Sequence, residues 1–275
     1  MQRYQISGEK AFQIAKLDAN DTADWDGKKK EAKKTFKTLR KELAVLQQKL
    51  YAEHKHKVLI ILQAMDTGGK DGTIRAIFEE VNPQGVKVAN FKVPSTFELD
   101  HDYLWRVHQK VPGKGEIVIF NRSHYEDVLV VRVHDLVPKE VWNKRYDHIN
   151  AFEKMLADEG TTILKFYLHI DKDEQKQRFL ERLTNPHKQW KFNPNDLEER
   201  KLWDQYQKAY QDALNKTSTP WAPWYAIPAN HNWYRNLCIS SIIVDTLRSF
   251  TMGYPDPIPD PQQYVKQLEN ESARD

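Results

Sequence analysis

Cysteine is almost absent from this chain of 275 residues: the one cysteine, Cys238, lies in an apolar stretch. A single cysteine excludes an internal disulfide, so the fold must rest on packing rather than on covalent cross-links. The apolar neighbours predict a buried, unreactive thiol. A chain without a disulfide framework is expected in a reducing compartment.

Long hydrophobic runs are also missing. No apolar stretch approaches the roughly 20 residues that a membrane-spanning helix needs. The first ten residues, MQRYQISGEK, lack the apolar segment of a secretory signal peptide. These absences lead us to expect a cytoplasmic protein with no membrane partner.

The chain has little excess of charge of either sign, because 42 basic residues face 39 acidic ones and the net charge is +3. Proteins that coat nucleic acid usually carry strongly basic surfaces, so nucleic acid is not an expected partner. Apolar residues make up 40% and charged residues 29%, which is typical of a globular chain rather than a disordered one.

The sequence does contain a regular alternation of short apolar runs and amphipathic segments. Apolar positions at three- and four-residue steps predict a long helix over 28–54. The predicted strands are 58–62, 86–92, 116–120, 161–170 and 226–229, and further helices are predicted up to 80, over 139–159 and over 233–250. This alternation implies βαβ units, and therefore an α/β fold whose parallel sheet has helices on both faces.

We expect three segments along the chain. Residues 1–27 are polar and irregular and are predicted to form an N-terminal arm, and residues 28–254 to form one domain. Residues 255–275 form a proline-rich tail. Because every second residue from 255 to 261 is proline, the segment 254–261 is predicted to be an extended strap along the surface, neither helix nor central strand.

The strongest motif directly follows the first predicted strand and precedes a helical stretch. It reads Ala64-Met65-Asp66-Thr67-Gly68-Gly69-Lys70-Asp71-Gly72. Glycines let the backbone amides of such a loop point at a phosphate, and the following helix presents its positive N-terminal end. The compact charge of Lys70 can then reach the transferred phosphate. The predicted phosphate-binding residues of this loop are Gly68, Gly69, Lys70, Asp71 and Gly72.

This loop departs from the Walker A pattern at both ends. Ala64 stands in place of the first glycine, and Asp71 replaces the serine or threonine that usually holds magnesium. Asp66 adds a carboxylate that would repel phosphate unless a cation lay between them. We therefore expect Asp66 to bind Mg²⁺, or Mn²⁺ in its place. The alternative is a glycine-rich turn with a helix-capping aspartate.

A second polar motif, Asn121-Arg122-Ser123-His124-Tyr125-Glu126-Asp127, follows the third predicted strand. Ligands of doubly wound sheets bind at the carboxyl ends of strands, so Asn121 and Arg122 should emerge beside the phosphate loop. Arg122 suits neutralisation of a transferring phosphate, and Arg132 lies ten residues further on. Glu126 and Asp127 are candidates for holding a second metal ion or orienting the acceptor. The alternative is that they pair with Arg122 or Arg132 in a structural network.

A dense basic stretch occupies residues 172–201. Arg178 and Arg182 are four residues apart and so share one face of a helix, and Lys188 lies in the proline-containing segment that follows. Two helices joined in this way suit a mobile lid over a phosphate site. The alternative is a solvated basic face, but the stretch follows the fourth strand, on the same edge of the sheet as the phosphate loop.

Together these motifs resemble those of the family-2 polyphosphate kinases in order and spacing. The matching segments are 64–72, Val93-Pro94-Ser95 and 120–128, and the resemblance extends from about residue 29 to 254. It implies a P-loop kinase fold similar to thymidylate kinase, with three layers (α/β/α), a five-stranded parallel sheet and a helical lid. It also implies Mg²⁺-dependent phosphoryl transfer between inorganic polyphosphate and nucleotides.

The resemblance implies roles for single residues as well. Asp66, Lys70 and Arg122 are the expected catalytic residues, with Arg178 and Arg182 similar to lid arginines. The motifs and the resemblance together give the full set of expected contacts. The expected metal ligands are Asp66, Asn121 and Glu126; the expected nucleotide contacts are Asn121, Arg122, Glu126 and Asp127; and the expected polyphosphate contacts outside the loop are Arg132, Arg178, Arg182 and Lys188.

Asn121 is a departure, because many members have aspartate there, and an amide binds Mg²⁺ more weakly than a carboxylate. The residues after Ser123 are similar to those of the family subgroup that phosphorylates both nucleoside monophosphates and nucleoside diphosphates. AMP and ADP are therefore the expected acceptors and ATP a product, with GMP and GDP as further candidates. The family also implies a homodimer or homotetramer.

Two other functions remain open from the sequence. One is an ATP-dependent nucleotide kinase on the same P-loop fold, although such a loop would carry serine or threonine in place of Asp71. The other is a non-catalytic binder of polyphosphate or nucleic acid that uses the basic stretch. The modest net charge and the loop carboxylates argue against it.

Overall fold

The computed structural model describes residues 2–8 and 11–271. A five-stranded parallel sheet in the order β2-β3-β1-β4-β5 forms its centre. The strands are β1 (Lys57–Ala64), β2 (Val86–Asn90), β3 (Ile117–Asn121), β4 (Thr161–His169) and β5 (Trp224–Pro228). In β1, every residue after Lys57 is buried, as a strand covered on both faces requires. The predicted α/β fold with a five-stranded parallel sheet is confirmed.

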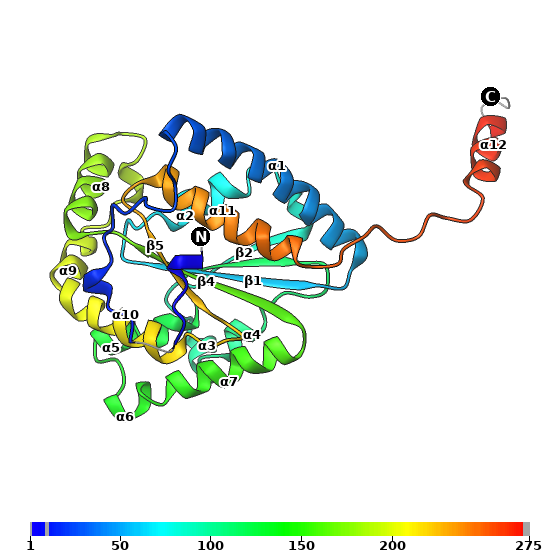
Figure 1. Cartoon of the computed structure of the whole chain (residues 1–275). Helices are drawn as coiled ribbons and strands as arrows, with labels where there is room; N and C mark the ends of the chain where they lie inside the picture. The colour runs from blue at the N-terminus through cyan, green and yellow to red at the C-terminus, as the bar shows by residue number, and fades with distance from the viewer. Residues whose placement is uncertain (1, 9–10, 272–275) are drawn as a thin grey trace.

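Helices cover both faces of this sheet and make three layers (Figure 1). On one face lie α1 (Lys29–Glu53), α2 (Lys70–Ile77) and α11 (Asn232–Arg248). On the other lie α3 (Thr96–Leu99), α4 (Trp105–His108), α5 (Val130–Val133), α6 (Lys139–Trp142), α7 (Arg145–Asp158) and α10 (Trp203–Thr217). Two further helices, α8 (Lys172–Thr184) and α9 (Asn195–Lys201), lie beyond the carboxyl ends of the strands.

The long helix α1 packs its apolar face on α11. Leu39, Leu43 and Leu50 are buried, at the spacing that the sequence predicts for one face of a helix. Helix α11 lies between α1 and the sheet, so its apolar residues are covered on several sides. Cys238 is part of this layer, and burial raises its pKa to about 12, in keeping with the predicted unreactive thiol.

Two predicted helices differ in extent from the observed ones. The helix after the phosphate loop ends at Ile77 rather than near 80, and the stretch 139–159 is divided into α6 and α7. Trp142 and Tyr146 are buried on either side of this division. The apolar pattern therefore runs through the break, which is why periodicity did not reveal it.

The N-terminal segment packs beside β5. The amide of Ile6 donates a hydrogen bond to the carbonyl of Trp224 (2.8 Å), and the hydroxyl of Tyr4 lies 2.6 Å from that of Tyr234. Tyr4 and Ile6 are buried. Residues 2–8 therefore extend the core at this edge of the sheet.

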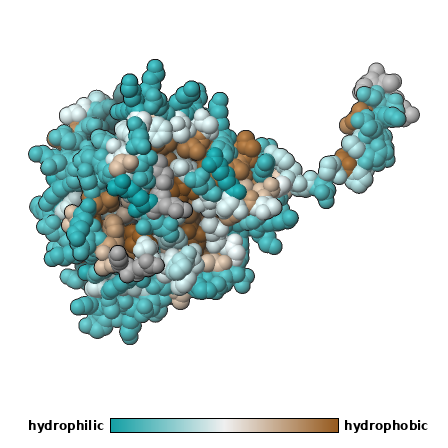
Figure 2. Space-filling view, viewed as in Figure 1, coloured by the Kyte–Doolittle hydropathy of each residue, from teal (hydrophilic) through white to brown (hydrophobic). Residues whose placement is uncertain are grey.

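The C-terminal tail does not follow the surface, so the prediction of a strap is wrong. Residues 253–271 are all exposed, and the segment ends in a helix, α12 (Pro261–Glu271), that projects away from the body (Figures 1 and 2). Alternating prolines keep the segment before it extended, but none of its side chains is buried on the body. Pro261 begins the helix, because proline is favoured in the first helical turn.

Figure 2 shows a mostly hydrophilic surface, with hydrophobic areas on the body and on the projecting helix α12. Val265, on α12, is exposed. No helix within the described ranges is both long and apolar enough to cross a lipid bilayer.

Candidate active site

The glycine-rich loop joins the central strand β1 to helix α2. Gly69 precedes the helix with φ of 97°, a conformation that side chains disfavour. At Gly68 a Cβ atom would lie 2.4 Å from the Cβ of Ala64, too close for any side chain. Both glycines are therefore required by the backbone path. The loop leaves the amides at the start of α2 available to an anion.

Lys70 lies at the first position of α2, and its side chain folds back over the loop. Its Nζ donates a hydrogen bond to the carbonyl of Ala64 (3.1 Å). Burial lowers the pKa of Lys70 to about 8, and the positive charge of Arg122 contributes to the shift. The loop thus holds a desolvated amine, whose charge is stabilised when an anion binds beside it.

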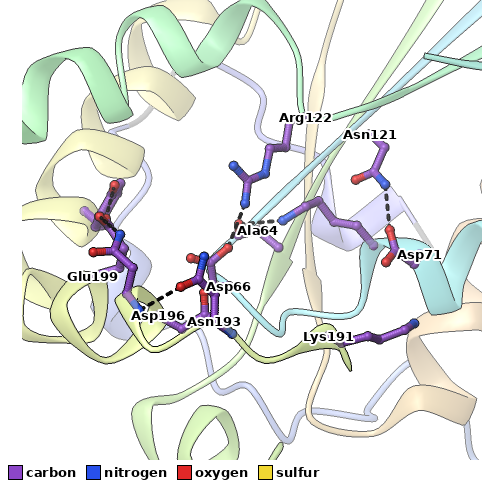
Figure 3. A network of polar contacts seen from close by, with 12 residues as sticks. Ala64, Asp66, Asp71, Asn121, Arg122, Lys191, Asn193, Asp196 and Glu199 are labelled. Atoms are coloured by element: carbon purple, nitrogen blue, oxygen red, sulfur yellow. Dashed lines mark hydrogen bonds and ion pairs between the residues drawn. The ribbon is translucent and has the colours of Figure 1, made fainter. Parts of the chain in front are cut away.

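The second motif meets the loop because β1 and β3 are neighbours in the sheet. Leu62 is in register with Asn121, and the amide of Arg122 donates to the carbonyl of Leu62 (3.2 Å). Arg122 has φ of 62°, an uncommon value for a residue with a side chain. This turn directs its guanidinium to Asp66, at 2.9 Å (Figure 3). The expectation that Asn121 and Arg122 emerge beside the loop is confirmed.

Several carboxylates lie near the cations of Lys70 and Arg122. Burial raises the pKa of Glu126, and the nearby charge of Asp66 adds to the shift, while Arg122 and Lys70 oppose it. Asn121 donates a hydrogen bond to Asp71 (2.6 Å), so its amide is directed at that carboxylate (Figure 3). In the described part of the chain, no three His, Cys, Asp or Glu residues are grouped closely enough to enclose a metal ion.

Asp196, on α9, is a site residue that the sequence analysis missed. It lies beside Asp66 in Figure 3, although 130 positions separate the two in the chain. Burial raises the pKa of Asp196, and the negative charge of Asp66 contributes. Arg182 lies 3.7 Å from its carboxylate. An acidic residue near the start of a helix is usually read as helix-stabilising, so no pattern distinguished this one.

With this geometry established, comparison with known proteins identifies the family. The family model described as polyphosphate kinase 2 matches residues 26–252. The chain belongs to the polyphosphate kinase 2 family. It is 60% identical over 257 residues to the AMP/ADP-polyphosphate phosphotransferase of Meiothermus ruber, covering 94% of this chain and 96% of that one.

Two further relatives of this polyphosphate kinase 2 chain cover almost its full length. The ADP-polyphosphate phosphotransferase of Rhodopseudomonas palustris is 42% identical over 278 residues, covering 94% of this chain and 96% of the relative. The crystal structure of polyphosphate kinase 2 from Arthrobacter aurescens superimposes with a TM-score of 0.93 at 39% identity, covering 98% of this chain and 96% of that one. The family match, the sequence relatives and the superimposed fold therefore point to the same family.

In the present polyphosphate kinase 2 chain, Arg178 connects α8 to the phosphate loop. It donates to the carbonyls of Thr67 (2.9 Å) and Ala229 (2.6 Å) and pairs with Glu174 (2.7 Å). These contacts occupy all three of its nitrogen atoms, so the side chain connects the basic stretch to both the loop and the end of β5. Arg178 is close to the loop, as expected, but its guanidinium is held by two backbone carbonyls and by Glu174.

The other two cations predicted on this stretch lie further out. Arg182 donates to the carbonyl of Lys191 (3.3 Å) and faces Asp196. Lys188 is half exposed and lies 3.5 Å from Glu181. Neither of these residues is committed to a short carboxylate contact, so both remain candidates for an anionic ligand.

Arg132 and Asp127 are directed to other partners. Arg132 pairs with Asp212 on α10 (2.6 Å) and lies over the ring of Trp142. Asp127 pairs with Arg145 (2.9 Å), and burial raises its pKa to about 6. The alternative interpretation expected Asp127 to pair with Arg122 or Arg132; the structure does show an ion pair, but its cation is Arg145.

A buried polar network supports the second motif from behind. His124, Tyr125, Glu153 and Lys165 are all fully buried. Lys165 contacts Glu153 (2.5 Å) and the Tyr125 hydroxyl (2.8 Å), and that hydroxyl donates to Glu153 (2.8 Å). A lysine within the apolar run of β4 was the one available signal of this network, which holds the residues after Arg122 in place.

Proposed function

We propose that this protein transfers the terminal phosphoryl group between inorganic polyphosphate and nucleotides, converting AMP to ADP and ADP to ATP. The observation that carries the proposal is a carboxylate inside the phosphate loop, Asp66, placed opposite Lys70 and Arg122. The names of the relatives in Meiothermus ruber and Rhodopseudomonas palustris support this substrate class. GMP and GDP are further candidate acceptors.

In the proposed mechanism the chain's own groups position and neutralise phosphate. The amides that begin α2 and the amine of Lys70 bind the terminal phosphate of the donor chain. Arg122, held by its strained turn, neutralises charge on the oxygens of the transferred group. The attacking oxygen of the acceptor phosphate is already ionised near neutral pH, so no strong general base is required.

The donor set fits a magnesium ion, with Mn²⁺ as a substitute. Mg²⁺ is commonly held by one or two carboxylates together with substrate phosphates and water, which does not require three clustered carboxylates. Asp66 and Glu126 are the carboxylates that would hold it. Asp66 already pairs with Arg122, and the positive charges of Arg122 and Lys70 act on Glu126 as well. When bound, the ion supplies charge neutralisation between carboxylate and phosphate.

We further propose that the chain consists of an N-terminal arm, residues 1–27, and a kinase domain, residues 28–254. Within that domain, residues 172–201 act as a lid. Support comes from the position of α8 and α9 at the carboxyl ends of the strands, and from Asp196 facing the loop. Arg182 and Lys188 would contact polyphosphate when the lid closes. We propose a homodimer or homotetramer as the working form, as the family resemblance implies. A cytoplasmic location is proposed because the single buried thiol of Cys238 suits a reducing compartment.

The decisive experiment measures ATP formation from ADP and polyphosphate, and ADP formation from AMP and polyphosphate, with and without Mg²⁺. We expect both reactions, and we expect chelation of the metal to abolish them. Replacing polyphosphate by ATP as the donor, with AMP as acceptor, tests the other kinase activity. Rapid transfer from ATP and none from polyphosphate would contradict the proposal.

A further inference from the structure

Arg235, in the first turn of α11, is a buried cation without an acidic partner. Its side chain is 2% exposed. Nη1 donates to the amide oxygen of Asn232 (2.8 Å), and Nε and Nη2 donate to the amide oxygen of Asn236 (3.1 and 2.9 Å). Among the described residues, no carboxylate forms an ion pair with it. Its hydrogen bonds are therefore satisfied while its charge is not.

The guanidinium of Arg235 lies directly against the phosphate loop. A Cβ atom on Gly69 would fall 2.2 Å from its Nη1, and one on Gly72 would fall 4.0 Å from its Nη2. These glycines flank the first residues of α2, whose amides face the anion site. Arg235 thus occupies the space behind the loop and adds a full positive charge to the positive end of that helix.

The neighbourhood of Arg235 adds further positive charge and, within residues 2–8 and 11–271, no negative charge that pairs with it. A second guanidinium, that of Arg178, lies 3.5 Å from the same Cβ position on Gly69, but it has Glu174 as a partner. Burial and the charge of Arg178 lower the pKa of Arg235 to about 9, which still leaves it protonated at neutral pH. A buried charge is unfavourable unless an opposite charge lies near, so the protein alone leaves an uncompensated cation here.

We propose that Arg235 is a component of the phosphate-binding site, a fixed charge behind the loop whose counter-charge is the terminal phosphates of the bound polyphosphate. It acts as a positioning residue, through the glycine loop and without touching the reacting atoms. This inference rests on the proposed function, because it takes the loop as the place where the phosphate chain end binds. It makes Arg235 a determinant of affinity for highly anionic donors.

The test compares Arg235→Gln with the matched control Arg248→Gln. Glutamine keeps an amide donor for Asn236 but removes the charge, whereas Arg248 lies on the same helix, exposed and paired with Glu42. The measurements are the rise in thermal midpoint of each variant on adding polyphosphate, relative to its own ligand-free midpoint, and the KM for polyphosphate at two salt concentrations. Arg235→Lys, which keeps a positive charge, is the second variant.

We expect Arg235→Gln to lose most of the polyphosphate-induced rise and to raise the KM for polyphosphate about tenfold or more, with a smaller change in kcat, as expected for lost binding of donor. Its KM should also depend less on salt. Arg235→Lys should recover part of the affinity, and Arg248→Gln should match the wild type.

Other results separate this inference from the proposed function. If Arg235→Gln keeps the full rise and the wild-type KM, the role of Arg235 is overturned and the phosphotransferase activity stands. A lower ligand-free midpoint with unchanged KM would assign Arg235 a structural role only. A wild-type protein that neither responds to polyphosphate nor uses it would overturn the proposed function itself.

Discussion

At the scale of single residues, the amine of Lys70 carries the most specific prediction. Lys70→Ala removes the cation that faces the donor phosphate, and we expect the rate of phosphoryl transfer to fall on the order of 10²–10³-fold. Lys154→Ala is the control, because Lys154 is an exposed lysine paired with Asp158. The measurement is the initial rate of ATP formation from ADP and polyphosphate. Normal turnover in Lys70→Ala would rule out the arrangement.

The pKa of Lys70 gives a prediction about pH. Since this pKa is about 8 in the folded protein, against 10.5 as its ordinary value, the free site loses its positive charge as pH rises through about 8. We expect the KM for polyphosphate to rise between pH 7 and 9.5. Between about pH 8 and 10.5 the unfolded chain still binds this proton and the folded chain does not. The free energy of unfolding should therefore rise with pH over that range, as the cost of burying the charged amine disappears.

Lys70→Ala is the control for this pH effect as well. It should lose both the rise in KM and the gain in stability, measured by initial rates and by urea unfolding at each pH. An unchanged pH profile in the variant would show that another group is responsible.

At the scale of secondary-structure elements, the buried network between α7, β4 and the second motif fixes how these elements pack. Glu153→Gln leaves Lys165 charged and fully buried without its carboxylate. We expect a loss of roughly 3–5 kcal/mol in the free energy of unfolding, measured by urea denaturation. Lys154→Gln, next along the same helix and exposed, should cost less than about 0.5 kcal/mol.

A second variant separates charge from packing in this network. Replacing Glu153 and Lys165 together by methionine removes both charges while keeping similar volume. We expect this double variant to regain most of the lost stability, because neither buried charge then lacks its partner. A double variant as unstable as Glu153→Gln would indicate that the hydrogen bonds to Tyr125 matter more than the charges.

The elements nearest the loop were predictable from sequence because their signals are local. The apolar run of β1, the glycines and the start of α2 are adjacent in the chain, and the carboxyl-end rule for parallel strands then placed Arg122 beside them. The partners of Asp127 and Arg132 were not predictable. Arg132 and Asp212 are 80 residues apart, and only packing of α5 on α10 joins them.

The same limit applies to Asp196 and Arg235. Nothing in the sequence near either residue differs from an ordinary helix beginning, so periodicity and motif spacing carry no information about them. Both reach the site because α9 and α11 come from distant parts of the chain. The projecting tail was also missed, since proline spacing predicts an extended backbone but not its direction.

At the scale of the whole molecule, the tail adds nothing to the hydrophobic core of the body. Residues 253–271 are all exposed, and none of them belongs to the core cluster. We expect removal of residues 255–275 to change the free energy of unfolding by less than about 0.5 kcal/mol and to leave the phosphotransfer rate unaltered. Thermal unfolding and initial rates check this. A large loss of stability would show that the tail packs on a body, its own or that of another copy.

The lone buried thiol of Cys238 makes the protein convenient for fluorescence work. A maleimide dye reacts with accessible thiolates, and this thiol is both covered and protonated. A cysteine introduced at the exposed Glu198 on α9 would then be the single labelled position, with no need to remove the native one. Emission from that dye during mixing with polyphosphate and ADP would report, in real time, whether α9 moves before or after the chemical step.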